Sequence, residues 1–116
     1  MFKMNHVHLK TPDVEKTMKF YMDNFGATVK GPMAGGFQLD LHGLQVNITA
    51  INQTQKHRQY YGIEHMAVTT ADYEGAMAKM RANGVEVLEE LLGATGQRIA
   101  FLQCPDGAQM EIIERK

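Results

Sequence analysis

The chain repeats its own pattern, and this repeat constrains the fold more than any other feature of the sequence. A shift of 59 positions carries His6 onto His65 and carries Asp13 onto Asp72. Each copy begins with alternating apolar and polar residues, which is typical of a half-buried strand, and continues with apolar residues at helical spacing. Self-similarity of this kind indicates that one supersecondary unit occurs twice.

Each copy predicts one strand, one helix and three further strands. In the first copy a strand over residues 3–10 leads into a helix with Thr11 as N-cap and Pro12 at the first helical position, and Gly26 ends this helix. Further strands are expected over 28–30, 37–41 and 44–51, with a loop over 31–36. The second copy predicts a strand that begins near 64, a helix over 71–83, strands over 85–89, 97–103 and 108–114, and a loop over 91–96. The pattern is therefore that of two βαβββ units.

Length and charge limit the organisation and the function. A chain of 116 residues predicts one domain, with unit 1 at about 1–51, a linker at 52–61 and unit 2 at about 62–116. A net charge of −1 without charged blocks favours neither a nucleic-acid partner nor a membrane surface. Cys104 is the only cysteine, and the N-terminus has no apolar signal region, so we expect a cytoplasmic protein. A chain this short also gains from association with a second copy.

The alternation places several polar side chains on the strand faces opposite the helices. This set comprises His6, His8, Asn47, His65 and Glu111. Two imidazoles and a carboxylate suit a divalent metal and leave other positions for water or substrate. The alternative reading is that the histidines are surface or satisfied core residues and that Glu111 is solvated, and spacing alone leaves both open.

Three motifs resemble a known superfamily. They are Asn5-His6-Val7-His8-Leu9 followed by Pro12-Asp13 and Phe20-Tyr21, then Glu64-His65-Met66-Ala67-Val68, and finally Ala100-Phe101-Leu102 through Pro105-Asp106-Gly107 to Glu111. Over residues 4–114 the chain resembles the vicinal oxygen chelate superfamily, which contains glyoxalase I, extradiol dioxygenases, methylmalonyl-CoA epimerase, and fosfomycin and bleomycin resistance proteins. The resemblance implies an α+β fold in which two tandem βαβββ units form a cupped mixed sheet.

The resemblance also implies a metal centre. The metal would be one divalent ion of Fe, Mn, Ni or Zn, held by His6, His65 and Glu111. In members with a fourth protein ligand, that ligand occupies the position of Asn47. The substrate is then a small molecule that chelates the metal through neighbouring oxygens. Many short members are homodimers, and the site is then either within one chain or shared between two.

Three functions remain open at this stage. The sequence interpretation leans toward a dioxygenase, because three protein ligands leave room for both substrate and dioxygen. A lyase or isomerase like glyoxalase I is the first alternative, weakened because Asn47 stands where that enzyme has Glu or Gln, and an amide cannot take a proton. A ligand-sequestering dimer of the bleomycin-resistance type is the second alternative, but those proteins lack the metal-binding set.

Further residues are candidates for catalysis or substrate binding. Glu111 and His8 are the expected catalytic acid or base groups. The side chains expected to bind substrate, the alternative being ordinary packing, are Asn47, Phe101, Arg98 and Phe37.

Overall fold

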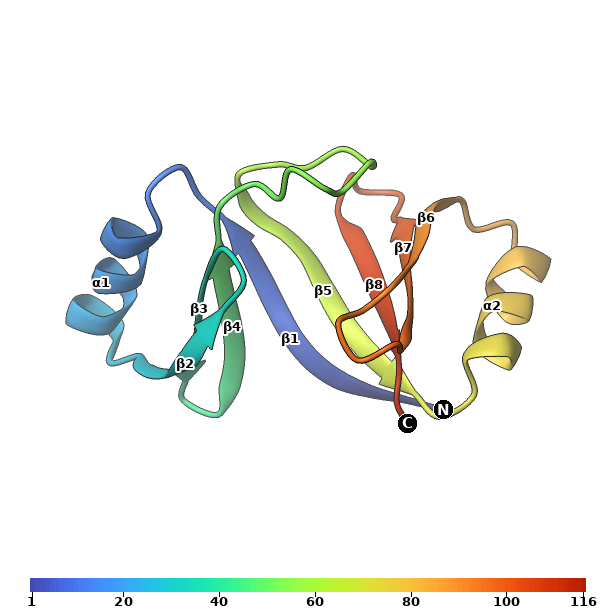
Figure 1. Cartoon of the computed structure of the whole chain (residues 1–116), viewed down its shortest axis with the longest axis horizontal. Coiled ribbons are helices and arrows are strands. Elements are labelled where there is room, and N and C mark those ends of the chain that lie inside the picture. The colour runs from blue at the N-terminus through green and yellow to red at the C-terminus, as the bar shows by residue number, and fades with distance from the viewer. The chain divides into compact units, whose positions relative to one another are not determined.

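The computed structural model describes all residues from Met1 to Lys116, and its elements follow the βαβββ order twice (Figure 1). The first set of elements is β1 (Phe2–Lys10), α1 (Val14–Phe25), β2 (Thr28–Met33), β3 (Gly36–Leu41) and β4 (Leu44–Thr49). The second set is β5 (Gly62–Thr70), α2 (Tyr73–Ala82), β6 (Val87–Leu92), β7 (Arg98–Gln103) and β8 (Gln109–Glu114). This βαβββ order, found twice, confirms the predicted α+β class.

Strand pairing makes the sheet a mixed one, as predicted. The strands follow the order β2-β3-β4-β1-β5-β8-β7-β6. The pairs β1–β4 and β5–β8 are parallel, whereas β2–β3, β3–β4, β6–β7 and β7–β8 are antiparallel. Contacts divide the chain into two compact units: residues 6–64, here unit N, and residues 1–5 with 65–116, here unit C.

The core of unit N lies between α1 and one face of its strands. Partly buried side chains of α1, namely Val14, Met18 and Tyr21, pack on the buried cluster of Leu9, Ala27, Leu39, Val46 and Ile48. The helix ends at Gly26, whose φ of 74° is left-handed and whose backbone N–H donates to the carbonyl of Tyr21.

The N-cap of α1 differs from the expectation. Asp13, not Thr11, is the cap: its backbone is extended and its carboxylate accepts the backbone N–H of Lys16 at 3.1 Å. The hydroxyl of Thr11 instead accepts the backbone N–H of Asp13 at 3.1 Å and lies 2.8 Å from the hydroxyl of Thr17. Thr11 therefore stabilises the backbone just before the helix, at the cap residue Asp13, and is not itself the cap.

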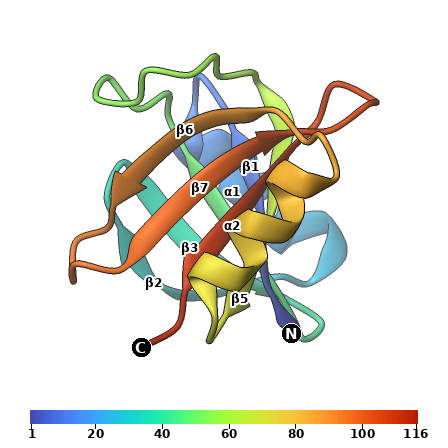
Figure 2. The same cartoon turned by 90° about the vertical axis from the view of Figure 1, so that its right-hand side faces the viewer.

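The core of unit C has the same construction. Tyr73, Met77 and Met80 of α2 pack against a buried cluster that includes Ala100, Leu102 and Ile112. Figure 2 shows α2 lying over β7 and β8 of its own unit. The carboxylate of Asp72 caps α2 by accepting the backbone N–H of Gly75 at 2.9 Å. None of the chain's helices has the length and apolar character that a membrane crossing requires.

Two of the expected loops are shorter than predicted. Residues 31–33 continue β2, and residues 91–92 continue β6, whereas the sequence predicts loops for both segments. Pro32 is tolerated within β2 because β2 is an edge strand, where a missing N–H need not break a ladder. The segment between β4 and β5 contains neither helix nor strand, as expected for the linker at 52–61.

Two strand glycines of unit N predict opposite responses to the same substitution. A Cβ at Gly36 would overlap the backbone carbonyl of Ile48 on β4, whereas a Cβ at Gly31 would meet nothing within 4 Å. Gly36→Ala should therefore lower the free energy of unfolding by about 2 kcal/mol or more, and Gly31→Ala should change it by less than about 0.5 kcal/mol. Urea denaturation measures both values. Equal effects would contradict the close pairing of β3 and β4.

Candidate metal centre

Unit N contributes two buried histidines from one strand. His6 and His8 lie two residues apart on β1, so their side chains share a face, and their ring centroids are 5.6 Å apart. The ring of His8 is oriented by Thr49, whose hydroxyl lies 2.7 Å from Nε2. Sequence reasoning missed Thr49, although it lies on the same strand face as Asn47 two residues away.

Asn47 lies on the face opposite the helix, as the sequence predicts, and the structure places it directly beside His8. The two residues are register partners in the parallel β1–β4 pair, and Asn47 is only 3% exposed. Its Oδ1 accepts a hydrogen bond from Nε2 of Gln45 at 3.0 Å. The amide oxygen of Asn47 is therefore already engaged within the strand.

Unit C contributes a histidine and a carboxylate held together. His65 on β5 and Glu111 on β8 are brought close by the parallel pairing of these strands, and Nε2 lies 3.3 Å from Oε1. Their side chains are only 2% and 10% exposed. Two atoms that ligate one ion at about 2.0–2.2 Å lie roughly 3.0–3.5 Å apart at ordinary coordination angles, so this pair fits a metal without rearrangement.

Phe101 completes the surroundings of this pair. It is the register partner of Glu111 across β7 and β8, and its ring meets that of His65 edge-on, with centroids 5.3 Å apart. A fixed aromatic neighbour holds the imidazole in one orientation. Phe101 thus lies on the face where the sequence placed it.

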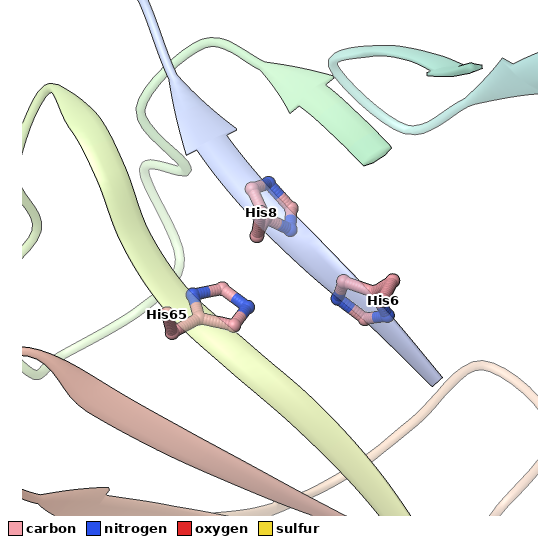
Figure 3. Close-up of side chains that lie close together, drawn as sticks. All are labelled: His6, His8 and His65. Carbon is pink, nitrogen blue, oxygen red and sulfur yellow. The ribbon is translucent and has the colours of Figure 1, made fainter. Parts of the chain in front are cut away.

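The candidate ligands have the chemistry of a transition-metal site. Figure 3 shows three buried histidines, of which His6 and His8 belong to β1 in unit N and His65 belongs to β5 in unit C, and each offers an imidazole nitrogen that could ligate a metal. Within unit C, Glu111 adds an anionic oxygen through its contact with His65. Neutral imidazole and carboxylate suit divalent Zn, Fe, Ni and Mn. His8, expected only as an acid or base, is thus also a candidate ligand.

Two expected substrate residues lie on the other face of their strands. Phe37 pairs with Ile48, and its strand neighbour Leu39 is part of the core under α1, so the expectation that Phe37 shares a face with Asn47 is wrong. Its apolar side chain follows the alternation that buries Leu39.

Arg98 is likewise on the helix-covered side. Its guanidinium lies 4.8 Å from the ring centroid of Tyr73 on α2 and contacts the carboxylates of Glu74 at 3.0 Å and Glu114 at 2.7 Å. The expectation that Arg98 lines the polar face is therefore wrong. Acidic partners on α2 and β8 bind it instead and connect the helix to the sheet.

Comparison with known proteins gives one family and several distant relatives. The family model described as "Glyoxalase/Bleomycin resistance protein/Dioxygenase superfamily" matches residues 3–112. A mitochondrial methylmalonyl-CoA epimerase from Dictyostelium discoideum is 25% identical over 134 residues, which cover 97% of this chain and 78% of the relative. A lactoylglutathione lyase from Haemophilus influenzae is 26% identical over 123 residues, which cover 96% and 91%.

Among solved structures, a hypothetical protein from Bacillus halodurans superposes with a TM-score of 0.77 at 20% identity, covering 99% of this chain and 95% of that one. This likeness supports the fold. The plant lactoylglutathione lyases that match are longer, and the chain spans 43% of their length.

The Arg98 contacts predict a specific dependence of stability on pH. Two guanidinium N–H groups of Arg98 donate to Oε2 of Glu114, its backbone N–H donates to Oε1, and these hydrogen bonds lower the pKa of Glu114 to about 2. A carboxylate whose folded pKa lies below its unfolded value of about 4.3 stabilises the fold above that value, and this contribution disappears as pH falls toward 2. Glu114→Gln should therefore reduce stability at neutral pH and flatten its decline between pH 5 and 2, measured by denaturation at each pH. Parallel curves for the two proteins would contradict the contact.

Proposed function

Because the chain belongs to the glyoxalase/bleomycin resistance protein/dioxygenase superfamily, we propose that it is a metal-dependent lyase or isomerase that moves a proton on a carbon next to a carbonyl. The substrate in this proposal is a small molecule that offers two neighbouring oxygens. The buried pair of His65 and Glu111, at a ligand-to-ligand distance, is the observation that carries the proposal. Family membership alone supports the fold and the general metal chemistry.

The proposed ligands are His6, His65 and Glu111. His6 and His65 occupy equivalent positions of the two copies, and both are buried on polar strand faces. A buried carboxylate and buried imidazoles are costly to keep out of water unless they are paired or coordinate a metal, which favours a shared ion. We further propose a homodimer, which suits a short chain and is compatible with a site made within one chain or between two.

The choice of reaction follows the relatives. The sequence favours a dioxygenase, but the matching relatives named above are a lyase and an epimerase. Epimerisation and intramolecular isomerisation next to a carbonyl both require that a proton leaves and returns to carbon. Proton transfer is therefore the proposed chemistry, and it corresponds to the first alternative from the sequence.

The side chains of this chain divide the remaining tasks. The bound divalent ion would supply Lewis-acid polarisation of the substrate oxygens. Asn47 has no basic atom, so it cannot remove the proton. His8 can remove it, because the hydroxyl of Thr49 fixes the ring and an imidazole can act as a general base. Glu111 is the second candidate base, if its carboxylate leaves the ion.

The proposed ligand set makes a prediction about metal content. Protein purified without chelator should contain about one divalent ion per chain by elemental analysis, and His65→Ala and Glu111→Ala should each retain less than a tenth of it. His42→Asn is the matched control: His42 lies in a turn outside the proposed site and has a φ of 53°, which asparagine tolerates. Full metal retention in His65→Ala, or a wild type that neither contains metal nor gains thermal stability from added ions, would overturn the ligand assignment.

The proposed role of His8 makes a prediction that distinguishes the catalytic base from the metal ligands. His8→Gln should keep its metal but lose at least about a hundredfold in kcat, because a positioned acid or base contributes about 10²–10⁴. Thr49→Val, which removes the hydroxyl that orients His8, should show a smaller loss. The assays are isomerisation of the hemithioacetal of glutathione and methylglyoxal, and epimerisation of methylmalonyl-CoA. Loss of metal from His8→Gln would instead make His8 a ligand, and unchanged kcat would move the base to Glu111.

A further inference from the structure

A chain of side-chain hydrogen bonds on the polar face of unit N fixes the amide of Asn47. Nζ of Lys30 donates to Oε1 of Gln45 at 2.8 Å, and Nε2 of Gln45 donates to Oδ1 of Asn47 at 3.0 Å. Lys30 lies on β2, and the other two residues lie on β4, two positions apart on the same face. The series thus runs from solvent at Lys30 to a buried position beside His8.

The identity of each atom in this series follows from the lysine. An ammonium group only donates hydrogen bonds, so the atom of Gln45 that meets Nζ must be its carbonyl oxygen. The other atom of the same amide is then an NH₂ group, and the atom of Asn47 that it meets must be an acceptor, Oδ1. Amide orientations are usually ambiguous, but here one cation determines two of them in succession.

Asn47 is left with a donor for the site. Its Oδ1 is taken by Gln45, and its Nδ2 has no hydrogen-bond partner within the chain. Asn47 is 3% exposed and is the register partner of His8. Nδ2 is not one of the fully buried polar atoms that lack a partner, so it keeps some contact with solvent. An amide NH₂ at such a position can donate to an acceptor that a ligand brings.

We propose that Asn47 is a substrate-binding hydrogen-bond donor that contacts an anionic oxygen, and that Gln45 and Lys30 are positioning residues that hold its amide in this orientation. The substrate class is a small molecule with two neighbouring oxygens, at least one of which carries negative charge when bound or during proton transfer. The contact to substrate rests on the proposed function, whereas the amide orientation rests on the hydrogen bonds alone. In this arrangement Asn47 donates to substrate and does not ligate the metal through its oxygen.

Gln45→Glu is the decisive variant, because it replaces the donor next to Asn47 with an acceptor. The amide of Asn47 should then rotate so that Nδ2 donates to the new carboxylate and Oδ1 faces the site. Gln45→Met removes the hydrogen bond without reversing its polarity. Leu44→Glu controls for charge, because it adds the same carboxylate one residue away on the opposite strand face, where Leu44 is 38% exposed.

The first measurement uses the metal-free full-length protein. In a ¹H–¹⁵N spectrum, one Asn47 Nδ2 proton should move downfield in Gln45→Glu, because it now donates to a carboxylate, and should not do so in Gln45→Met or Leu44→Glu. Absence of this movement would overturn the assigned amide orientation. This result does not depend on any metal or activity.

The second measurement uses Co(II) and oxalate, a small dianion with neighbouring oxygens. Wild type and Gln45→Glu should bind Co(II) equally by visible absorption, but oxalate affinity should fall at least about tenfold in Gln45→Glu, since a charge-assisted hydrogen bond is replaced by repulsion. Leu44→Glu should lose less than about threefold. An amide that rotates without any loss of oxalate affinity overturns the donor role. A wild type that binds neither Co(II) nor oxalate overturns the proposed function and the donor role with it, while the amide orientation is decided by the first measurement.

Discussion

The burial of ionisable groups on strands is the constraint on which the rest of the structure depends. A carboxylate removed from water costs several kcal/mol unless it is paired, and Glu111 meets this requirement through His65 at 3.3 Å. That pair can form only if β5 and β8 hold a fixed parallel register. The register is in turn stabilised by the apolar opposite faces of these strands, where Val68, Met110 and Ile112 pack in the core beneath α2. One face of the sheet therefore supplies the stability that permits costly groups on the other.

The same reasoning explains why much of the polar face was predictable from sequence. Side chains alternate strictly along a strand, so one slip in register would move a whole set of residues to the wrong face. Asn47 and Glu111 are flanked by apolar residues that pack toward the helices, and each was therefore assigned correctly. Phe37 was misassigned although the same rule applies to it: it alternates with Gln38 and shares parity with Leu39, which is in the core. The alternation itself therefore places Phe37 on the helix-covered face.

The contacts of Arg98 and the role of Thr11 cannot be predicted from the alternation of side chains. The position of a long cation depends on partners distant in sequence, and Arg98 is bound by Glu74 and Glu114 and stacks on Tyr73. Nothing in the local sequence reveals these partners. At the start of α1, Thr11 and Asp13 are both good caps, and the choice between them depends on the backbone, which is still extended at Asp13. Local propensity predicted the helix but not the residue at which it begins.

The two copies of the repeat are chemically unequal at one pair of positions, and this inequality has an electrostatic consequence. In the last strand of each copy the equivalent positions are 64 residues apart, which aligns Asn47 with Glu111, so one unit carries an amide where the other carries a carboxylate. In the proposed site a divalent ion with two neutral imidazoles and one carboxylate keeps a net charge of about +1, whereas a second carboxylate would cancel it. A site with residual positive charge stabilises negative charge that develops on substrate oxygen. The amide of Asn47, whose oxygen accepts a hydrogen bond from Gln45, adds an N–H donor that would also stabilise this negative charge. The absence of a second carboxylate at this position and the oriented amide donor of Asn47 act together, and both favour an anionic oxygen as the group that the proposed site binds.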